Sequence, residues 1–415
     1  LTKALKAENI VYNNDPDKGI DIQGVINAPG GISLHATKID IGSGAILRTD
    51  VSDIDFTKVV NVEGVDSGIT GGLDASYKDG NIVLKAHAEQ VLDDTKLKTI
   101  TDAEAAKWEK ISEREATINV DGTIKSAKDL TINAESVITF KEGDKFNAVT
   151  QTKGISNFLK DFKNDWSVNY AKKDNKATVN IGKTADLYSA GNMDISATAE
   201  LTAKIATVTP AKGAGNSWVP ATAVGVIVAS NEAAVNVDGK LESKGTMAIN
   251  AKATTSLTVD AKTKTEKTAN DNFYIGVGVI DGEAKAEVNI NSGDEIKAAG
   301  SDTSKKKAFE ATATAKNTIS NSASASSKEK STINTAVNVT SYTSNATINV
   351  DRDITADNGS IKIDATNTTS NTNSTSNVLG SAVAPFANPF VLNTNDSDSK
   401  KAENAKKVEE GATES

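Results

Sequence analysis

A seven-residue phrase that recurs five times constrains the fold of this chain more than any other feature. It reads Ala-Thr-Ile-Asn-Val-Asp-Gly from Ala116 and returns in related form from Ala177, Ala233, Ala286 and Ala346. Successive copies start 61, 56, 53 and 60 residues apart. A period of this size is typical of repeat architectures, in which each unit buries its apolar face against its neighbours.

Apolar and polar residues alternate strictly within each unit. Ile118, Val120 and Ile124 share one face, while Thr117 and Asn119 share the other. Asp-Gly and Ser-x-Gly turns separate three such strand-like pieces. A β-sandwich would instead need antiparallel hairpins of varied sequence. We therefore predict an all-β fold, a parallel β-helix (β-solenoid) with short helical or loop insertions.

The length of one coil follows from three short strands and their turns, at roughly 20 to 25 residues. Each phrase-to-phrase unit should then hold two or more coils. The chain would contain roughly 16 to 20 coils and form a rod of about 80 to 100 Å. The Ala-, Thr-, Ser- and Lys-rich tracts 252–268 and 308–335 are interpreted as coils with a thin interior, or as loops.

The pattern divides the chain into four parts. We expect β-helix coils over residues 1–92 and a helical insertion over 93–115, its helix at 101–115. The β-helix with units of about 55 residues covers 116–394, interrupted by an aromatic insertion at 154–170. Residues 395–415 are interpreted as a polar linker to further repeats, and the whole chain as a segment of a longer polypeptide.

Composition narrows the classes of function. The net charge is −9 with Lys interspersed among acids, which argues against a nucleic-acid partner, since phosphate binding needs a concentrated basic surface. No apolar run reaches the roughly 20 residues of a transmembrane helix. The absence of Cys excludes disulfide and zinc-thiolate chemistry and fits a secreted bacterial chain that crosses an oxidising periplasm.

The order of motifs within the unit resembles a known family. The unit combines the Asn-containing phrase, a following strand such as the one around Ile249, and a preceding Val-Gly-Val strand such as the one at Val224. Over roughly residues 110–390 this order resembles the leukotoxin-type filamentous adhesins, very large proteins secreted by type V (two-partner) routes, as in fusobacteria. The resemblance implies a right-handed parallel β-helix, export through an outer-membrane partner, and a cell-surface role in host-cell binding or leukocyte killing.

Candidate catalytic and metal-binding residues are few. The alternation places His35 and His87 on the solvent-facing side, without a Ser or Cys nucleophile and a third group to complete a triad. Gly71-Gly72-Leu73-Asp74 is a single fragment rather than a calcium-binding nonapeptide array. We expect no catalytic residue, no cofactor and no metal.

The recurring acidic turn residues deserve the same test. Asp121, Asp238 and Asp351 would lie two or more coils apart, too far for a pair of catalytic carboxylates. An Asp before Gly is a common turn residue. Arg is nearly absent, with only Arg48, Arg114 and Arg352.

One cluster of aromatic residues stands out among the 9 Phe, 6 Tyr and 3 Trp of the chain. Phe158, Phe162, Trp166 and Tyr170 follow one another at intervals of four. One interpretation is a helix or looped strand whose aromatic stripe packs on an outer wall of the solenoid. The other is an exposed patch that binds a host receptor, glycan or membrane surface.

These observations favour a non-enzymatic segment of a secreted surface protein, acting as a stalk or host-cell-binding region. Two alternatives remain: a β-helical enzyme acting on polysaccharides, either a lyase or a glycosidase, and a directly cytotoxic segment.

Overall fold

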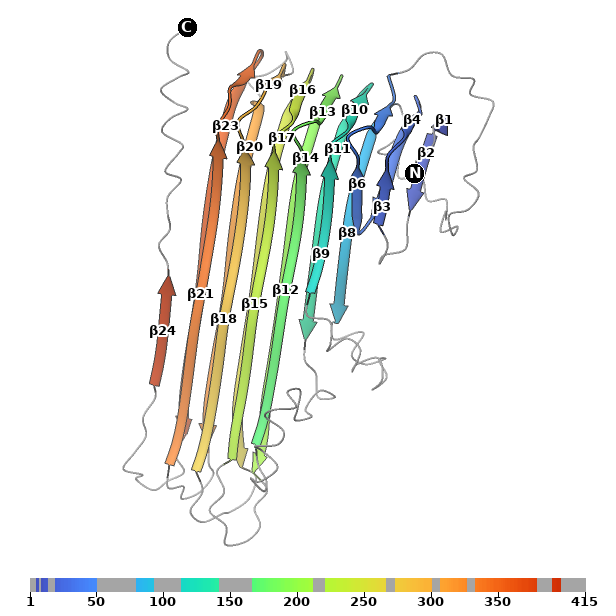
Figure 1. The fold of residues 1–415 in the computed structure, drawn as a ribbon. Coiled ribbons are helices and arrows are strands. Elements are labelled where there is room, and N and C mark those ends of the chain that lie inside the picture. The colour runs from blue at the N-terminus through green and yellow to red at the C-terminus, as the bar shows by residue number, and fades with distance from the viewer. Residues whose placement is uncertain are drawn as a thin grey trace.

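The computed structural model is a stack of coils made of three parallel β-sheets (Figure 1). It describes residues 5–6, 9–13, 19–50, 80–92, 113–141, 166–211, 221–265, 273–300, 307–326, 333–378 and 390–396. Within these residues every regular element is a strand, and each sheet takes every third strand of the chain. The predicted all-β parallel solenoid is confirmed.

Each coil contributes one strand to each sheet, and the three sheets differ in strand length. Sheet A has the short strands β1 (Leu5–Lys6), β4 (Val25–Asn27), β7 (Ile46–Arg48), β10 (Thr123–Ser126), β13 (Asp186–Ser189), β16 (Lys240–Ser243), β19 (Ile296–Ala298) and β22 (Ile354–Ala356). Sheet B has β2 (Asn9–Asn13), β5 (Gly31–Ala36), β8 (Ile82–Leu92), β11 (Leu130–Lys141), β14 (Met193–Ala211), β17 (Met247–Thr265), β20 (Lys307–Ser326) and β23 (Ser360–Val378). Sheet C has β3 (Gly19–Ile22), β6 (Lys38–Ile41), β9 (Glu113–Val120), β12 (Trp166–Ile181), β15 (Ala221–Val237), β18 (Phe273–Ile290), β21 (Ile333–Val350) and β24 (Phe390–Asp396).

The recurring phrases lie side by side in sheet C. Ala116 pairs with Ala177, Ala177 with Ala233, Ala233 with Ala286, and Ala286 with Ala346. Each phrase therefore marks one coil. The expectation of two or more coils per unit is wrong, and so are the predicted 16 to 20 coils, because each sheet has eight strands among the described residues.

The reason is strand length. The first coils have short strands, but β14 and β17 run for 19 residues and β20 for 20. The tracts 252–268 and 308–335 were expected to form coils with a thin interior, or loops. Where the structure describes them, they contribute 252–265 of β17, 308–326 of β20 and 333–335 of β21. Ala311, Ala313 and Ala315 of β20 are fully buried, so small side chains continue the interior where larger ones would not fit.

The proportions of the molecule change accordingly. Eight strands at the usual spacing give a stack about 35 Å deep, whereas a 19-residue strand spans about 60 Å. The described coils form a slab that is longer in the direction of the strands than along the stacking axis. The N-terminal coils lie at one end of the stack and the C-terminal coils at the other (Figure 1). The predicted rod of about 80 to 100 Å is therefore wrong.

Two hydrophobic cores fill each long coil. The first lies where all three sheets enclose the interior and contains Ile118, Ile132 and Leu187. The second lies between the far halves of sheets B and C and contains Leu201 and Leu257. The strands of sheets B and C run on past the prism enclosed by the three sheets and face each other as a two-layer sandwich.

A buried polar layer separates the two cores. Asn175 donates through Nδ2 to Oδ1 of Asn231 at 2.9 Å, and Ser136 donates to Oδ1 of Asn175 at 2.6 Å. Asn231 in turn donates to the carbonyl oxygens of Ala199 and Thr254. Because these side chains are buried, their hydrogen bonds tie sheet C to sheet B at a fixed register.

The two predicted insertions are only partly within the described residues. Residues 93–112 lie outside them, and Glu113, Arg114 and Glu115 belong to strand β9 rather than to a helix. Residues 154–165 of the aromatic insertion lie outside as well, whereas 166–170 begin strand β12. In the linker, 397–415 lie outside, and Asn395 and Asp396 end β24. The described part of the chain contains no helix of the length and hydrophobicity that a bilayer-spanning segment requires.

Candidate functional site: the outer face of sheet C

The outward side chains of sheet C form three bands along the strands. The asparagine band lies at the carboxyl ends, a charged band lies in the middle, and an apolar band lies toward the amino ends. Each band runs across several coils because equivalent residues stand in register. This face is the candidate site, because each band repeats side chains of one kind across several coils.

The asparagine band is a continuous ladder of side-chain hydrogen bonds. In each step Nδ2 of one Asn donates to Oδ1 of its neighbour: Asn349 to Asn289 at 2.8 Å, Asn289 to Asn236 at 2.9 Å, Asn236 to Asn180 at 2.8 Å, and Asn180 to Asn119 at 2.7 Å. The last step goes from Asn119 to the carboxylate of Asp40 at 2.6 Å. This ladder explains why every copy of the phrase contains Asn at this position.

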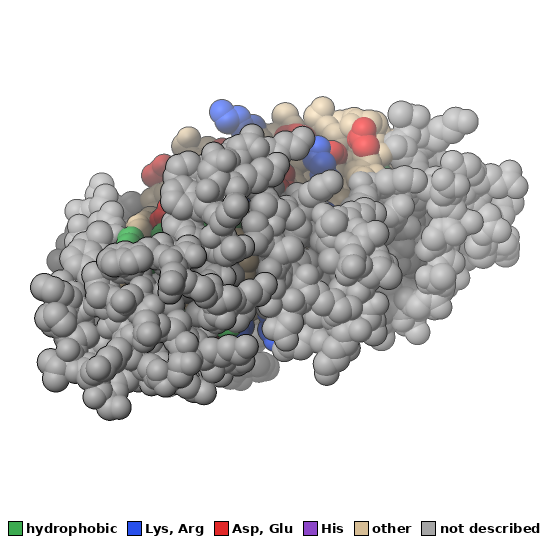
Figure 2. Space-filling view, turned by 90° about the horizontal axis from the view of Figure 1, so that it is seen from below, with side chains coloured by type: hydrophobic (Ala, Val, Ile, Leu, Met, Phe, Trp, Pro, Cys, Tyr) green, Lys and Arg blue, Asp and Glu red, His purple; other side chains and the backbone are tan. Residues whose placement is uncertain are grey.

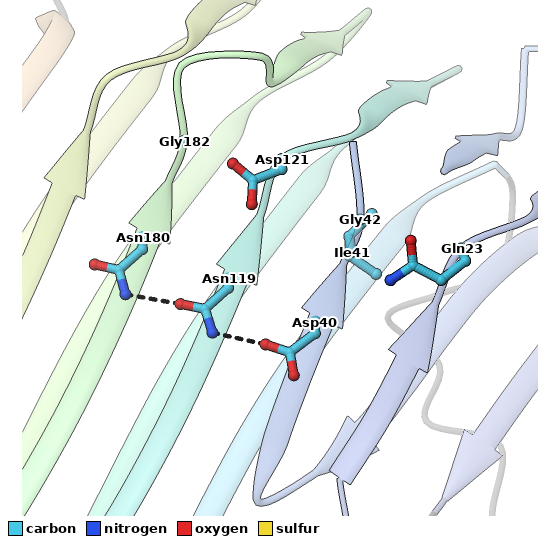
Figure 3. A pocket seen from close by; sticks show the side chains of 8 residues that line it. All are labelled: Gln23, Asp40, Ile41, Gly42, Asn119, Asp121, Asn180 and Gly182. Atoms are coloured by element: carbon cyan, nitrogen blue, oxygen red, sulfur yellow. Dashed lines mark hydrogen bonds between the residues drawn. The ribbon is translucent and has the colours of Figure 1, made fainter. Parts of the chain in front are cut away.

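A pocket of about 310 Å³ opens at the Asp40 end of the ladder (Figure 3). Its lining is mostly amides and carboxylates: Gln23, Asp40, Ile41, Gly42, Asn119, Asp121, Asn180 and Gly182. The Asp40 carboxylate accepts from Asn119 and lies 3.0 Å from Nζ of Lys38. The carboxylate and amide oxygens of this lining accept hydrogen bonds of the kind that hydroxyl and cationic groups donate.

The charged band consists of ion pairs rather than of one sign of charge. Nζ of Lys172 lies 3.0 Å from Asp174, and Nζ of Lys285 lies 2.9 Å from Glu287 and 3.6 Å from Glu232. Seen from below, basic and acidic side chains are interspersed along the visible rim of the described surface (Figure 2). Exposed pairs of this kind stabilise a fold by little.

The apolar band is formed by two rows of four outward residues on four neighbouring strands. Its members are Val168 and Tyr170 of β12, Val224 and Val226 of β15, Val277 and Val279 of β18, and Val337 and Val339 of β21. Tyr170 is 51% exposed, and the valines are partly exposed. Among the described strands, sheet B packs on the opposite, inner face of sheet C, so none of them covers this band.

The predicted aromatic patch is only partly visible. Phe158 and Phe162 lie outside the described residues, and Trp166 opens β12, where its backbone alone is described. The interval of four was interpreted as a helix or a looped strand, and residues 166–170 belong to a strand, in which Tyr170 faces outward. Tyr170 therefore belongs to a wider surface of valines that the sequence analysis missed. The alternating Val and Gly residues before each phrase were its only signal.

The two histidines lie on the outer surface of sheet B, as predicted. The His87 side chain is 40% exposed, with Nδ1 3.1 Å from Oε2 of Glu135. Nε2 of His35 lies 2.9 Å from Oγ of Ser33, a pairing that the sequence analysis did not identify. Ser33 is only 1% exposed, so this hydroxyl is closed to a substrate. The described residues contain no group of three or more His, Cys, Asp or Glu side chains placed to hold a metal ion.

Two of the three arginines are committed to structural contacts. Arg48 lies 2.7 Å from Asp50. The Arg352 guanidinium donates to the carbonyl oxygens of Val237 and Gly239, both at 2.7 Å, and to that of Asn291. Burial lowers the pKa of Arg352, while nearby Asp238 and Asp294 act in the opposite direction. Arg352 thus joins the turns of successive coils.

Comparison with protein-family models, curated proteins and solved structures finds no match to this chain. The class of protein is therefore defined by the fold alone, and that class is the parallel β-solenoid.

Proposed function

We propose that this chain is a non-enzymatic segment of a large secreted surface virulence protein of the leukotoxin or filamentous-adhesin kind. In this proposal it acts as a stalk and as a region that binds host cells at the bacterial surface, after export through an outer-membrane partner. The motif order that resembles this family supports the proposal, as does the repetitive architecture.

The observation that carries the proposal is the unbroken register of the long coils. Strands β12, β15, β18 and β21 pair along 16 to 18 residues, and the Asn ladder crosses five coils before it ends at Asp40. Such stacking produces a stiff scaffold. Further coils can join it at either end, because each coil contacts only its immediate neighbours. Its regular outer faces suit the presentation of contact surfaces.

A purified segment tests the host-binding part directly. We expect it to bind leukocytes in flow cytometry without loss of cell viability. Cell death caused by the isolated segment would instead support the directly cytotoxic alternative, and a complete lack of binding would leave only the stalk role.

The aromatic residues provide the site-specific version of this test. Phe162→Ala, Trp166→Ala and Tyr170→Ala should each reduce cell binding while the melting temperature stays within a few degrees of wild type. If binding persists in all three variants while the fold survives, the aromatic patch is not the contact.

The polysaccharide-enzyme alternative has one observation in its favour, namely that the pocket of Figure 3 is lined by two carboxylates, those of Asp40 and Asp121. Asp40 is already engaged by Lys38 and Asn119. Asp121 and Asp238 are separated by a further coil, about 10 Å in all, which is beyond the separation of most glycosidase pairs. Activity of the purified segment on a polysaccharide panel that Asp121→Asn abolishes would establish this alternative.

A further inference from the structure

The apolar band of sheet C reverses the usual distribution of polarity across a sheet. Beneath its two rows, the inward positions between them are Asn169, Gly225, Gly278 and Asn338, which stand in register on the same four strands. Asn169 and Asn338 are buried, at 4% and 0% exposure. The outward neighbours on both sides are Val or Tyr. At this level the outward positions of sheet C are more apolar than its own inward positions.

In an isolated chain this arrangement gains little from the outward valines. Buried amides need hydrogen-bond partners, and Asn338 uses its Nδ2 to donate to the carbonyl oxygens of Asn321 and Ser374, at 3.0 and 2.6 Å. Outward valines contribute little burial unless something covers them, since the gain is proportional to apolar area removed from water. The outward β-branched residues and the inward asparagines are both explained if another surface also buries the outer side of the band.

The size of the surface fits a modest protein interface. The two rows cover about 13 Å of strand length, which on four strands at about 4.8 Å spacing gives roughly 250 Å². Val228 and Ile275 add apolar side chains to the outward rows on either side of the band, and the register continues from Val337 and Val339 into the backbone of β24. Two bands face to face, each with the outward row on either side of it, bury about 1,000 Å² in total, the lower limit of specific interfaces.

The chemistry of the band favours a second β-sheet as its occupant. The two rows contain no ionised side chain, and their β-branched members form a flat surface of the kind that packs against another sheet at about 10 Å. A membrane surface fits less well, because Tyr170 is the only ring described in the rows and the adjoining outward positions include the carboxylates of Asp281 and Glu283.

We propose that two copies of this chain associate face to face through the apolar band of sheet C. A twofold axis brings the same surface of each copy to the interface, so an uncharged flat face is complementary to itself. In the bordering row, Lys172 and Asp281 carry opposite charges on different strands, so the border need not bring only like charges together. The pairing goes beyond the proposed stalk and adhesive function, because it specifies how two such segments are joined.

Sedimentation velocity on the full chain tests the pairing. We expect a reversible dimer with a dissociation constant in the micromolar range, about 10 μM, given the small area. Val226→Lys and Val279→Lys each place a charge in the band and should weaken the dimer at least tenfold. Ser230→Lys and Thr343→Lys add the same charge to the same face beyond the bordering row and should leave the dimer intact. Thermal melts followed by circular dichroism identify variants that fail to fold. The less disruptive substitutions Val226→Ser and Val279→Ser then replace those Lys variants.

Cross-linking locates the contact independently, because the chain has no Cys of its own. A single Val226→Cys variant should cross-link with short bismaleimides, whereas Lys252→Cys, exposed on sheet B, should not. The proposal is overturned if the wild-type chain stays monomeric at about 100 μM, or if the band variants dimerise as wild type does. Loss of cell binding by Val279→Lys in a chain that is always monomeric would assign the band to a host partner, which overturns the pairing and leaves the proposed function standing.

Discussion

At the scale of single residues, the Asn of each phrase has a role that its neighbours cannot take over. Asn236 both donates to Asn180 and accepts from Asn289, so it transmits the ladder from one coil to the next. Asn236→Ala removes both bonds and should lower the free energy of unfolding by about 1 to 2 kcal/mol in denaturant titrations. Lys176→Ala, an exposed change on the same sheet, is the matched control and should have an effect within about 0.5 kcal/mol.

Asn236→Asp separates the two directions of the ladder. At pH 7 a carboxylate still accepts from Asn289 but cannot donate to Asn180, so the variant should be destabilised. Below the ordinary carboxyl range of about 4, the protonated group regains a donor and the deficit relative to wild type should shrink. A deficit that is independent of pH would mean that hydrogen-bond direction is unimportant in the ladder.

Glycine in the Asp-Gly turn is required by space. A Cβ on Gly239 would lie 2.6 Å from the carbonyl oxygen of Gly182 and 2.8 Å from that of Ala185, and backbone atoms cannot move aside cheaply. Gly239→Ala should therefore lower the free energy of unfolding by about 2 kcal/mol or more, measured by chemical denaturation. Gly44→Ala is the control, since nothing lies within 4 Å of its Cβ position. Equal stability of the two variants would show that the turn has room to relax.

At the scale of strands, the polar layer holds sheets B and C together. Asn231 donates to the carbonyl oxygens of Ala199 and Thr254 and accepts from Asn175, all in the buried interior. Asn231→Ala leaves these groups without partners and should cost about 2 to 4 kcal/mol. Ser230→Ala, the outward neighbour, should change stability by less than about 0.5 kcal/mol. Similar melting curves for the two variants would contradict a structural role for the layer.

Strand β23 is attached to β20 partly through Glu310. The hydrogen bond from Lys307, and after it the one from Lys362, lowers the pKa of Glu310. A lowered folded-state pKa stabilises the fold above the ordinary Glu pKa of about 4.3, and this contribution is lost as pH falls through the folded-state value. Glu310→Gln should thus be slightly less stable than wild type at pH 7, by under about 1 kcal/mol, because the pairs are partly exposed.

Thermal melts across pH test this pair. The gap between Glu310→Gln and wild type should close as pH falls below the ordinary Glu range, and added salt should narrow it at pH 7. A gap that widens in acid would reverse the sign and refute the assignment.

The alternation of residues predicted the sheets and the inward positions of the phrase, because Ile118, Val120 and their equivalents leave only one face to bury. It could not predict strand length. In the tracts after Met247 and Phe309, Ala and Thr alternate with too little contrast in hydrophobicity to distinguish strand from loop, and only pairing with a neighbouring coil decides.

The same limit applies to the candidate site. Alternating Val and Gly would ordinarily place Val inside, yet Val224 and Val226 face outward and Gly225 faces inward, beside Val259 of sheet B. Close approach of the two sheets at this level leaves no room for a side chain. That constraint comes from the opposite strand and is invisible in the local sequence.

At the scale of the whole molecule, stability should follow the growth of the coils. The N-terminal strands β3 to β6 are three to six residues long, whereas β14 and β17 pair along 19 residues and enclose two cores. In a stacked architecture each coil is stabilised mainly by its immediate neighbours. Long central coils flanked on both sides should open least often.

Hydrogen–deuterium exchange with peptide-level readout measures this gradient. Amides of β14, β15, β17 and β18 should exchange most slowly, near the rate set by global unfolding, and those of β3 to β6 should exchange faster by local opening. Asn231→Ala should speed exchange in the far halves of β14 and β17, which line the second core, more than in their first residues, because the polar layer lies between the two. Uniform exchange along the chain would instead require that all coils unfold as one cooperative unit, with the short coils held as firmly as the long ones.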